Sequence, residues 1–256
     1  GLIVAGANAA QAITGATVAN GNTANATLTI NNVRVGATTY DYQVANTGTT
    51  GPSLRGAIQT NVNGANLTDS RLSGAGVTAS NYNTGAPGSN TGNLGVTFTA
   101  TSAGALAPLT GQSVNLTSNF DNIADQRLNI VVGAGAAAYN AANGNAATPV
   151  QVANQRVGGG NVAGVSVTNT AAAGAFSEDL RTTVGATTGG VTGSGAINAL
   201  LAGASNNSAI SVGVNTAVAG AQAGTVTLNY QTTGTVNGVS NGLGLAGANA
   251  PQVVNV

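Results

Sequence analysis

Short segments in which apolar and polar residues alternate recur along the whole chain. Clear examples are Ala26-Thr27-Leu28-Thr29-Ile30 and Thr225-Val226-Thr227-Leu228-Asn229-Tyr230. A period of two places the apolar side chains on one face of a strand, so these segments predict half-buried β-strands. Helix-like stretches are few, and the pattern predicts an all-β protein. Asn-Gly pairs between the segments favour tight turns with positive φ, and they stand at Asn63-Gly64, Asn143-Gly144, Asn237-Gly238 and Asn241-Gly242.

The strand-like segments recur in the same order in both halves of the chain, 112 to 126 residues apart. This spacing indicates the duplication of a domain rather than a short solenoid repeat. Each half holds about seven strand-like segments in ~110 residues, the size of an immunoglobulin-like sandwich. The matching segments are 32–36 with 154–158, 44–47 with 167–170, 54–55 with 180–181, 94–98 with 210–214 and 113–117 with 225–229.

We therefore expect two tandem immunoglobulin-like β-sandwich domains, at residues 25–136 and 137–256. Residues 1–24 precede the first repeat, and we interpret them as a strand-like N-terminal extension that a neighbouring subunit could exchange. The Ala-, Gly- and Asn-rich stretch near 133–150 is typical of a linker between the two domains.

The second half carries a series of short motifs that extends the comparison beyond the repeat itself. They are Arg156-Val157-Gly158, Val165-Ser166-Val167-Thr168-Asn169-Thr170, Phe176-Ser177-Glu178-Asp179-Leu180, Val191-Thr192-Gly193-Ser194-Gly195 and Leu200-Leu201-Ala202-Gly203. This order resembles the choice-of-anchor D repeats, which are related to the abnormal-spindle/hydin type of immunoglobulin-like sandwich. The resemblance covers about residues 25–256, although Pro52-Ser53-Leu54-Arg55 lacks the Phe and Glu of the pattern. It implies an exported bacterial surface protein of a family often tethered by a C-terminal sorting signal.

The composition argues against an enzyme. The chain has no His, Cys, Met, Trp or Lys, and six Arg balance six acidic residues, so its net charge is zero and only 5% of residues are charged. Acid–base catalysis, nucleophilic catalysis and metal ligation draw mostly on His, Cys, Lys, Asp and Glu, and three of these types are absent. We therefore expect no catalytic residue, no metal ligand and no cofactor site.

The neutral charge and the hydropathy pattern also limit the partners. No cluster of Arg supplies the basic field that a nucleic-acid binder needs. No run of eighteen apolar residues is present, so we expect no membrane span. The first residues, Gly1-Leu2-Ile3-Val4, lack an initiator methionine and a basic region. We interpret the chain as a processed or truncated piece of a longer protein that is secreted or displayed at the cell surface.

Two pairs of arginines recur in the two halves, Arg34 with Arg156 and Arg55 with Arg181. A ligand site is one interpretation of such a recurrence. The simpler one is that each arginine caps a turn or pairs with a carboxylate, an interaction of little energy at a surface.

The acidic residues give only one candidate site. Glu178 and Asp179 are adjacent, so in a strand they would face opposite sides. Asp121 and Asp125 could hold Ca²⁺ together with loop carbonyls, and Ca²⁺ is the one cofactor we keep open. It needs six or more oxygen ligands, and no acidic cluster of that kind exists here.

Tyr40 and Tyr42 flank Asp41 and would share one face of a strand. Aromatic residues are scarce in this chain, and a core or interface position is their commoner use. An exposed pair would instead form a platform for a glycan. An adhesin or carbohydrate-binding surface module is therefore the alternative function.

The surface favours self-association. Soluble β proteins protect their edge strands with Lys, Pro and charges, whereas this chain has no Lys, five Pro and few charges. We expect an extracellular structural protein that forms a homopolymer, a fibre or a surface layer, with a terminal strand completing a neighbour's sheet. The residues that we expect at this interface are Leu2, Ile3, Val4, Ile13, Val253 and Val254.

Overall fold

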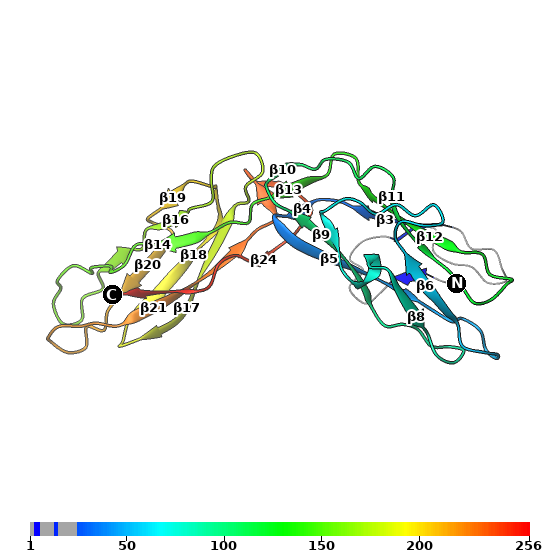
Figure 1. The fold of residues 1–256 in the computed structure, drawn as a ribbon. Coiled ribbons are helices and arrows are strands. Elements are labelled where there is room, and N and C mark those ends of the chain that lie inside the picture. The colour runs from blue at the N-terminus through cyan, green and yellow to red at the C-terminus, as the bar shows by residue number, and fades with distance from the viewer. Residues whose placement is uncertain (1–2, 6–12, 15–24) are drawn as a thin grey trace. The chain divides into compact units, whose positions relative to one another are not determined.

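The computed structural model describes residues 3–5, 13–14 and 25–256. The chain forms two compact units, residues 1–138 and 139–256, and the described part of each is built of strands (Figure 1). The prediction of an all-β fold with immunoglobulin-like sandwiches is confirmed.

The first unit contains the strands up to the middle of β13 and one turn of 3-10 helix, η1. Strand β13 runs across the boundary between the units. The elements are β1 (Ile3–Ala5), β2 (Ile13–Thr14), β3 (Ala26–Ile30), β4 (Val33–Arg34), β5 (Gly36–Val44), β6 (Arg55–Gln59), β7 (Leu72–Ser73), η1 (Ala75–Val77), β8 (Ser80–Asn83), β9 (Leu94–Ala100), β10 (Gly104–Ala105), β11 (Gln112–Leu116), β12 (Gln126–Val132) and β13 (Ala137–Tyr139).

Two sheets form the layers of this unit. One has the strand order β1-β5-β9-β7 and the other β2-β3-β12-β11-β6-β8. Neighbouring strands run antiparallel, except that β3 is parallel to β12, with Leu28 opposite Ile130. The order β1-β5-β9-β7 corresponds to strands A, B, E and D of the immunoglobulin fold, and β12-β11-β6 to G, F and C.

The core of the first unit follows from the alternation in the sequence. In β3 the residues Ala26, Leu28 and Ile30 are buried, and the threonines between them are partly exposed. Phe98 of β9 belongs to the opposite sheet and to the same buried cluster as Leu28. Burying these apolar faces against each other holds the two layers together.

The second unit contains the remaining strands. They are β14 (Gly144–Ala146), β15 (Val162–Gly164), β16 (Val167–Asn169), β17 (Leu180–Thr188), β18 (Thr192–Leu200), β19 (Ser205–Asn206), β20 (Ile210–Gly213), β21 (Thr225–Thr232), β22 (Thr235–Val236), β23 (Val239–Ser240), β24 (Ala246–Gly247) and β25 (Gln252–Asn255).

The strand pairs of the second unit repeat those of the first. Strand β25 pairs with β21 as β12 pairs with β11, and β15 pairs with β20 as β5 pairs with β9. The difference lies in β18, whose residues 192–195 pair with β20 while its later residues pair with β17. This strand joins the layers into a seven-stranded sheet, and β14-β16-β19 forms a smaller one.

Residues 3–5 and 13–14, the described part of the expected N-terminal extension, pair with strands of the first sandwich. Strand β1 pairs with β5 at the edge of one sheet, and β2 pairs with β3 at the edge of the other. The hydrogen-bonding groups of β5 and β3 at these edges are the physical reason, because an added strand satisfies them.

The boundary between the two units, after residue 138, falls within the stretch near 133–150 that we expected to be a linker, and this stretch forms β13 and β14. Its alanines are largely buried, and the main-chain N–H of Ala137 donates to the side chain of Asn32 at 2.9 Å. A Cβ atom on Gly144 would lie 2.2 Å from the ring of Tyr230. The small residues therefore permit close packing here, although the same composition is typical of flexible linkers.

Candidate functional site

The expected N-terminal interface residues lie on strands that pair within the same chain. Ile3 and Val4 of β1 are opposite Val44 and Gln43 of β5. Ile13 of β2 is opposite Leu28 of β3. Leu2 lies outside the described residues.

The two expected C-terminal interface residues differ in exposure. Val254 is fully buried opposite Val226 of β21, whereas Val253 is 56% exposed. The edge of β25 that faces away from β21 is also hydrogen-bonded, because the main-chain N–H of Val150 donates to the carbonyl of Asn255 at 2.8 Å. Val254 is thus a core residue, because β25 is the counterpart of the buried strand β12.

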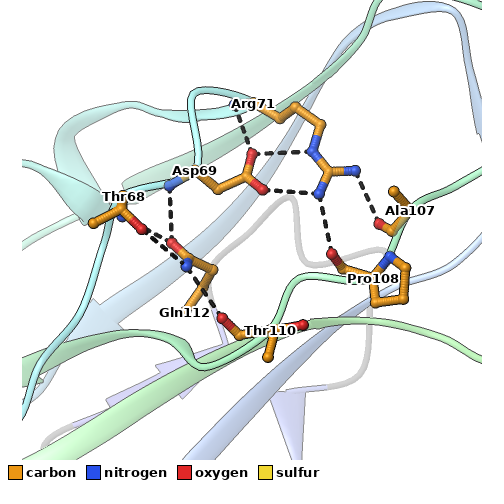
Figure 2. A network of polar contacts seen from close by, with 7 residues as sticks. All are labelled: Thr68, Asp69, Arg71, Ala107, Pro108, Thr110 and Gln112. Atoms are coloured by element: carbon orange, nitrogen blue, oxygen red, sulfur yellow. Dashed lines mark hydrogen bonds and ion pairs between the residues drawn. The ribbon is translucent and has the colours of Figure 1, made fainter.

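Asp69 and Arg71 form a bidentate ion pair in the first unit (Figure 2). Nε and Nη2 of Arg71 donate to the two carboxylate oxygens at 3.0 and 2.8 Å. Hydrogen bonds from the Arg71 side chain lower the pKa of Asp69 and raise that of Arg71. The guanidinium also donates to the carbonyls of Ala107 and Pro108 and lies 5.4 Å from the centre of the Phe98 ring.

Gln112 extends this network on the other side of Asp69 (Figure 2). Its Oε1 accepts hydrogen bonds from the main-chain N–H groups of Thr68 and Asp69 at 2.8 and 3.0 Å, and its Nε2 donates to the carbonyl of Thr110. The network fastens the segment before β7 to the segment before β11. Its donors are used within the protein, so we interpret it as a structural clamp. This ion pair was not predicted from the sequence, although an acid two residues before an arginine is a signal for it.

Glu178 and Asp179 are completely buried. Asn241 donates to Oε1 of Glu178 at 2.7 Å, and the hydroxyl of Thr232 donates to Oε2. These contacts hold the carboxylate inside the second unit, away from any solvent-borne substrate.

The carboxylate of Asp179 binds the turn between β22 and β23. It accepts the main-chain N–H groups of Asn237 at 3.1 Å and Gly238 at 2.9 Å, and the hydroxyl of Thr235 at 2.7 Å. Charge-assisted hydrogen bonds of this kind stabilise a turn that requires positive φ at two successive residues. Both acids of the second unit therefore serve its own structure.

Tyr40 and Tyr42 are core residues and form no exposed platform. They are 2% and 0% exposed, and burial raises the pKa of Tyr40 to about 12 and that of Tyr42 further. The hydroxyl of Tyr42 donates to the carbonyl of Gly76 at 2.7 Å, whereas the buried hydroxyl of Tyr40 has no partner among the described residues. The commoner use of aromatics, in the core, is the one found.

The candidate Ca²⁺ residues lie in the turn before β12. Asp125 accepts a hydrogen bond from the amide of Asn115 at 3.2 Å, and Asp121 is exposed. Within residues 3–5, 13–14 and 25–256, no three His, Cys, Asp or Glu residues lie close enough to hold a metal ion. The same residues contain no helix that is long and apolar enough to cross a membrane.

A groove of about 600 Å³ lies in the second unit between the loop that precedes β15 and the loop that follows β20. Its lining consists of Val150–Val157, Val214–Thr216, Val218–Gln222 and Val256. Arg156 lines it, and so do several amide side chains. No local sequence pattern indicates this groove, because the fold brings together two loops about sixty residues apart.

Comparison with protein-family models found no match for this chain, and no curated protein matches it either. Its function is therefore argued from its own residues.

Proposed function

We propose that this protein is an extracellular structural protein that self-associates into a fibre or surface layer through its β-sandwich units. The single observation that carries the proposal is the uncharged outer edge of β15. In this view the acids and the bidentate arginine maintain the fold and perform no catalysis.

Strand β15 is an edge strand whose outer side is open to a further strand. Among the strands that the structure describes it pairs with β20 alone, and Val162 and Gly164 are exposed. The main-chain N–H of Val165 donates to Ile210 of β20. Because the direction alternates along a strand, the N–H and C=O groups of Val162 and Gly164 point away from β20. Such a row of groups is a template for another chain.

Apolar side chains near this edge add to its tendency to associate. Val162 is the first residue of β15, Val157 lies in the loop before β15, and Val218 lies in the loop after β20. They are 63%, 59% and 63% exposed. No charged residue and no proline lies in β15. The strand is only three residues long, so the valines must supply much of the buried area.

Strand β8 offers a second and different edge, in the first unit. It is the outer strand of the six-stranded sheet, and Ser80, Asn81 and Asn83 are exposed. An interface between two unlike surfaces does not close on itself in general, so it can propagate into a filament. Pairing of β8 in one copy with β15 in the next is the arrangement that we favour.

Exchange of N-terminal strands is a second route to the same assembly. The positions of β1 and β2 at sheet edges allow a copy to donate them to its neighbour, as in domain swapping. Removal of residues 1–24 tests this route by itself: assembly that is unchanged by the removal excludes exchange and leaves edge pairing in place.

The substitution Val162→Lys tests edge pairing. A lysine on the edge must be desolvated when a second strand is added, so we expect the variant to remain monomeric where the unchanged chain forms filaments. Sedimentation velocity and negative-stain imaging, over a series of protein concentrations, distinguish these states.

The control is Val62→Lys, which places the same charge in a turn where Val62 is 54% exposed. We expect this variant to assemble like the unchanged chain. An unchanged chain that is monomeric at millimolar concentration contradicts self-association, and equal behaviour of the two lysine variants contradicts the role of β15.

The groove favours a second candidate function, a carbohydrate-binding surface module. Grooves lined by apolar side chains with a few converging polar groups are the usual form of a ligand site. A glycan array probed with the full chain tests this function, and the absence of saturable binding to any saccharide excludes it.

A further inference from the structure

The walls of the groove are held in place by main-chain hydrogen bonds. The N–H of Gly158 donates to the carbonyl of Thr216 at 2.9 Å, and the hydroxyl of Thr216 donates to the carbonyl of Gly159 at the same distance. At the other end, Gly224 and Val256 exchange two hydrogen bonds of 2.9 and 3.0 Å. These bonds connect the two walls, so a ligand enters a site that is largely formed in advance.

Arg156 is the one charged residue in the groove lining. It is exposed, and its guanidinium has no hydrogen bond or ion pair with any residue in the described part of the chain. The second unit has two acids, Glu178 and Asp179, and both are buried and bound to other groups. No side-chain carboxylate of this unit can therefore neutralise Arg156 at the surface, and the groove favours an anionic ligand.

Amide side chains supply the remaining polar groups of the groove. Gln151, Asn154 and Gln222 line it and make no side-chain hydrogen bond to the described residues. Gln155, in contrast, is occupied, because its Oε1 accepts the main-chain N–H of Asn161 at 2.7 Å. Three open amides, each with two donors and an acceptor, match a ligand that carries many hydroxyl groups.

We propose that the groove binds an acidic saccharide, with Arg156 holding a sugar carboxylate and Gln151, Asn154 and Gln222 holding hydroxyls. The planar guanidinium of arginine matches a carboxylate in a bidentate manner. Apolar residues such as Val152 and Val214 offer contact to the C–H groups of a sugar ring. This inference rests on the second candidate function, carbohydrate binding, and is independent of self-association.

The test uses the full chain, at concentrations where sedimentation shows monomers, and an oligogalacturonate as the probe. The matched probe is the same oligosaccharide after reduction of its carboxyl groups, which is neutral. We expect saturable binding of the acidic form in calorimetry and binding at least about tenfold weaker for the neutral form, because the neutral form cannot make the charge-assisted hydrogen bonds to Arg156. Shifts in the side-chain amide resonances of Gln151, Asn154 and Gln222 locate the site.

Arg156→Gln is the decisive variant, and Arg181→Gln, which changes the other arginine of the unit outside the groove, is its control. We expect a loss of at least about tenfold for the first and none for the second. Equal binding of both probes overturns the acidic specificity and leaves carbohydrate binding intact. Poly-glutamate that binds as tightly as the oligogalacturonate overturns the choice of a saccharide. Absence of binding to every probe overturns the inference together with the second candidate function.

Discussion

Asn169 occupies a fully buried position at the end of β16, and the substitution Asn169→Ala tests how the repeated Val-x-Asn-Thr motif stabilises each unit. Its Nδ2 donates to the carbonyls of Glu178 and Leu200 at 3.1 and 3.0 Å. Its Oδ1 accepts the main-chain N–H groups of Asn143 and Ala171 at 3.1 and 3.3 Å. One side chain thus connects four main-chain groups from different segments.

Removing this side chain leaves two enclosed carbonyls without their donor. A buried polar group without a partner costs about 1–3 kcal/mol, and alanine is too small to replace either bond. Water reaches the site poorly, because Asn169 is 0% exposed. We therefore expect Asn169→Ala to lower the free energy of unfolding of the second unit by about 3 kcal/mol.

Asn46 in the first unit provides the matched control. It holds the same place in the repeat, and its Nδ2 donates to the carbonyl of Pro52 at 3.2 Å while its Oδ1 accepts the N–H of Gly48 at 3.2 Å. Its side chain makes two hydrogen bonds instead of four, and it is 9% exposed. We expect Asn46→Ala to lower the free energy of unfolding of its unit by about 1 kcal/mol.

Urea unfolding, followed by circular dichroism, measures both losses. With a urea dependence of about 2 kcal/mol per molar, a loss of 3 kcal/mol lowers the midpoint by about 1.5 M. Hydrogen exchange at the amides of β16 and β17 shows whether the loss belongs to the second unit. Equal losses for the two variants, or a loss below about 1 kcal/mol for Asn169→Ala, would refute the reasoning.

Three further predictions use single substitutions or conditions. Tyr40→Phe removes a buried hydroxyl that has no partner among the described residues, so it should stabilise the first unit by about 1 kcal/mol in urea unfolding. Tyr42→Phe removes the hydrogen bond to Gly76 and should destabilise the unit by about 1 kcal/mol. Changes of the same sign in the two variants would contradict this reasoning. The lowered pKa of Asp69 means that its carboxylate stabilises the first unit above the ordinary carboxyl value near 4 and that this contribution is lost as the pH falls through the folded-state pKa. Asp69→Asn should therefore flatten the fall in melting temperature between roughly pH 5 and pH 2, and a profile like that of the unchanged chain refutes the assignment. Raising NaCl from about 0.05 to 0.5 M should leave self-association nearly unchanged, because β8 and β15 carry no charge; filaments that dissolve with salt, as judged by light scattering, refute uncharged edge pairing.

Much of the fold could be predicted because strand periodicity and turn chemistry are local. Asn63-Gly64 and Asn237-Gly238 both take positive φ at both residues, as their sequences predict. Asn143-Gly144 does not, because Gly144 lies in β14 against the ring of Tyr230. A glycine required by packing and a glycine required by a turn look alike in the sequence.

The repeat was a good guide only where the segments are strands. The match of 32–36 with 154–158 aligns β4 of the first unit with a loop of the second unit that lines the groove. Val33 is a buried strand residue, 2% exposed, whereas its counterpart is the polar Gln155, whose Oε1 accepts the main-chain N–H of Asn161 within the loop. Loops between repeats diverge in structure, so a motif in a loop does not transfer a position.

The groove and the open edge depend on long-range pairing, and this is why no local pattern indicated them. Both features appear only when the strands are placed in the fold. Strand β25 is the counterpart of β12, so Val254 is a core residue, and β15 is left as the open edge of the sheet. The acids of the second unit are bound by groups inside it. A surface of amides, small apolar groups and one unpaired arginine then suits two partners: its strand edge suits another copy of the chain, and its groove, which shares Val157 and Val218 with that edge, suits a hydroxyl-rich anion.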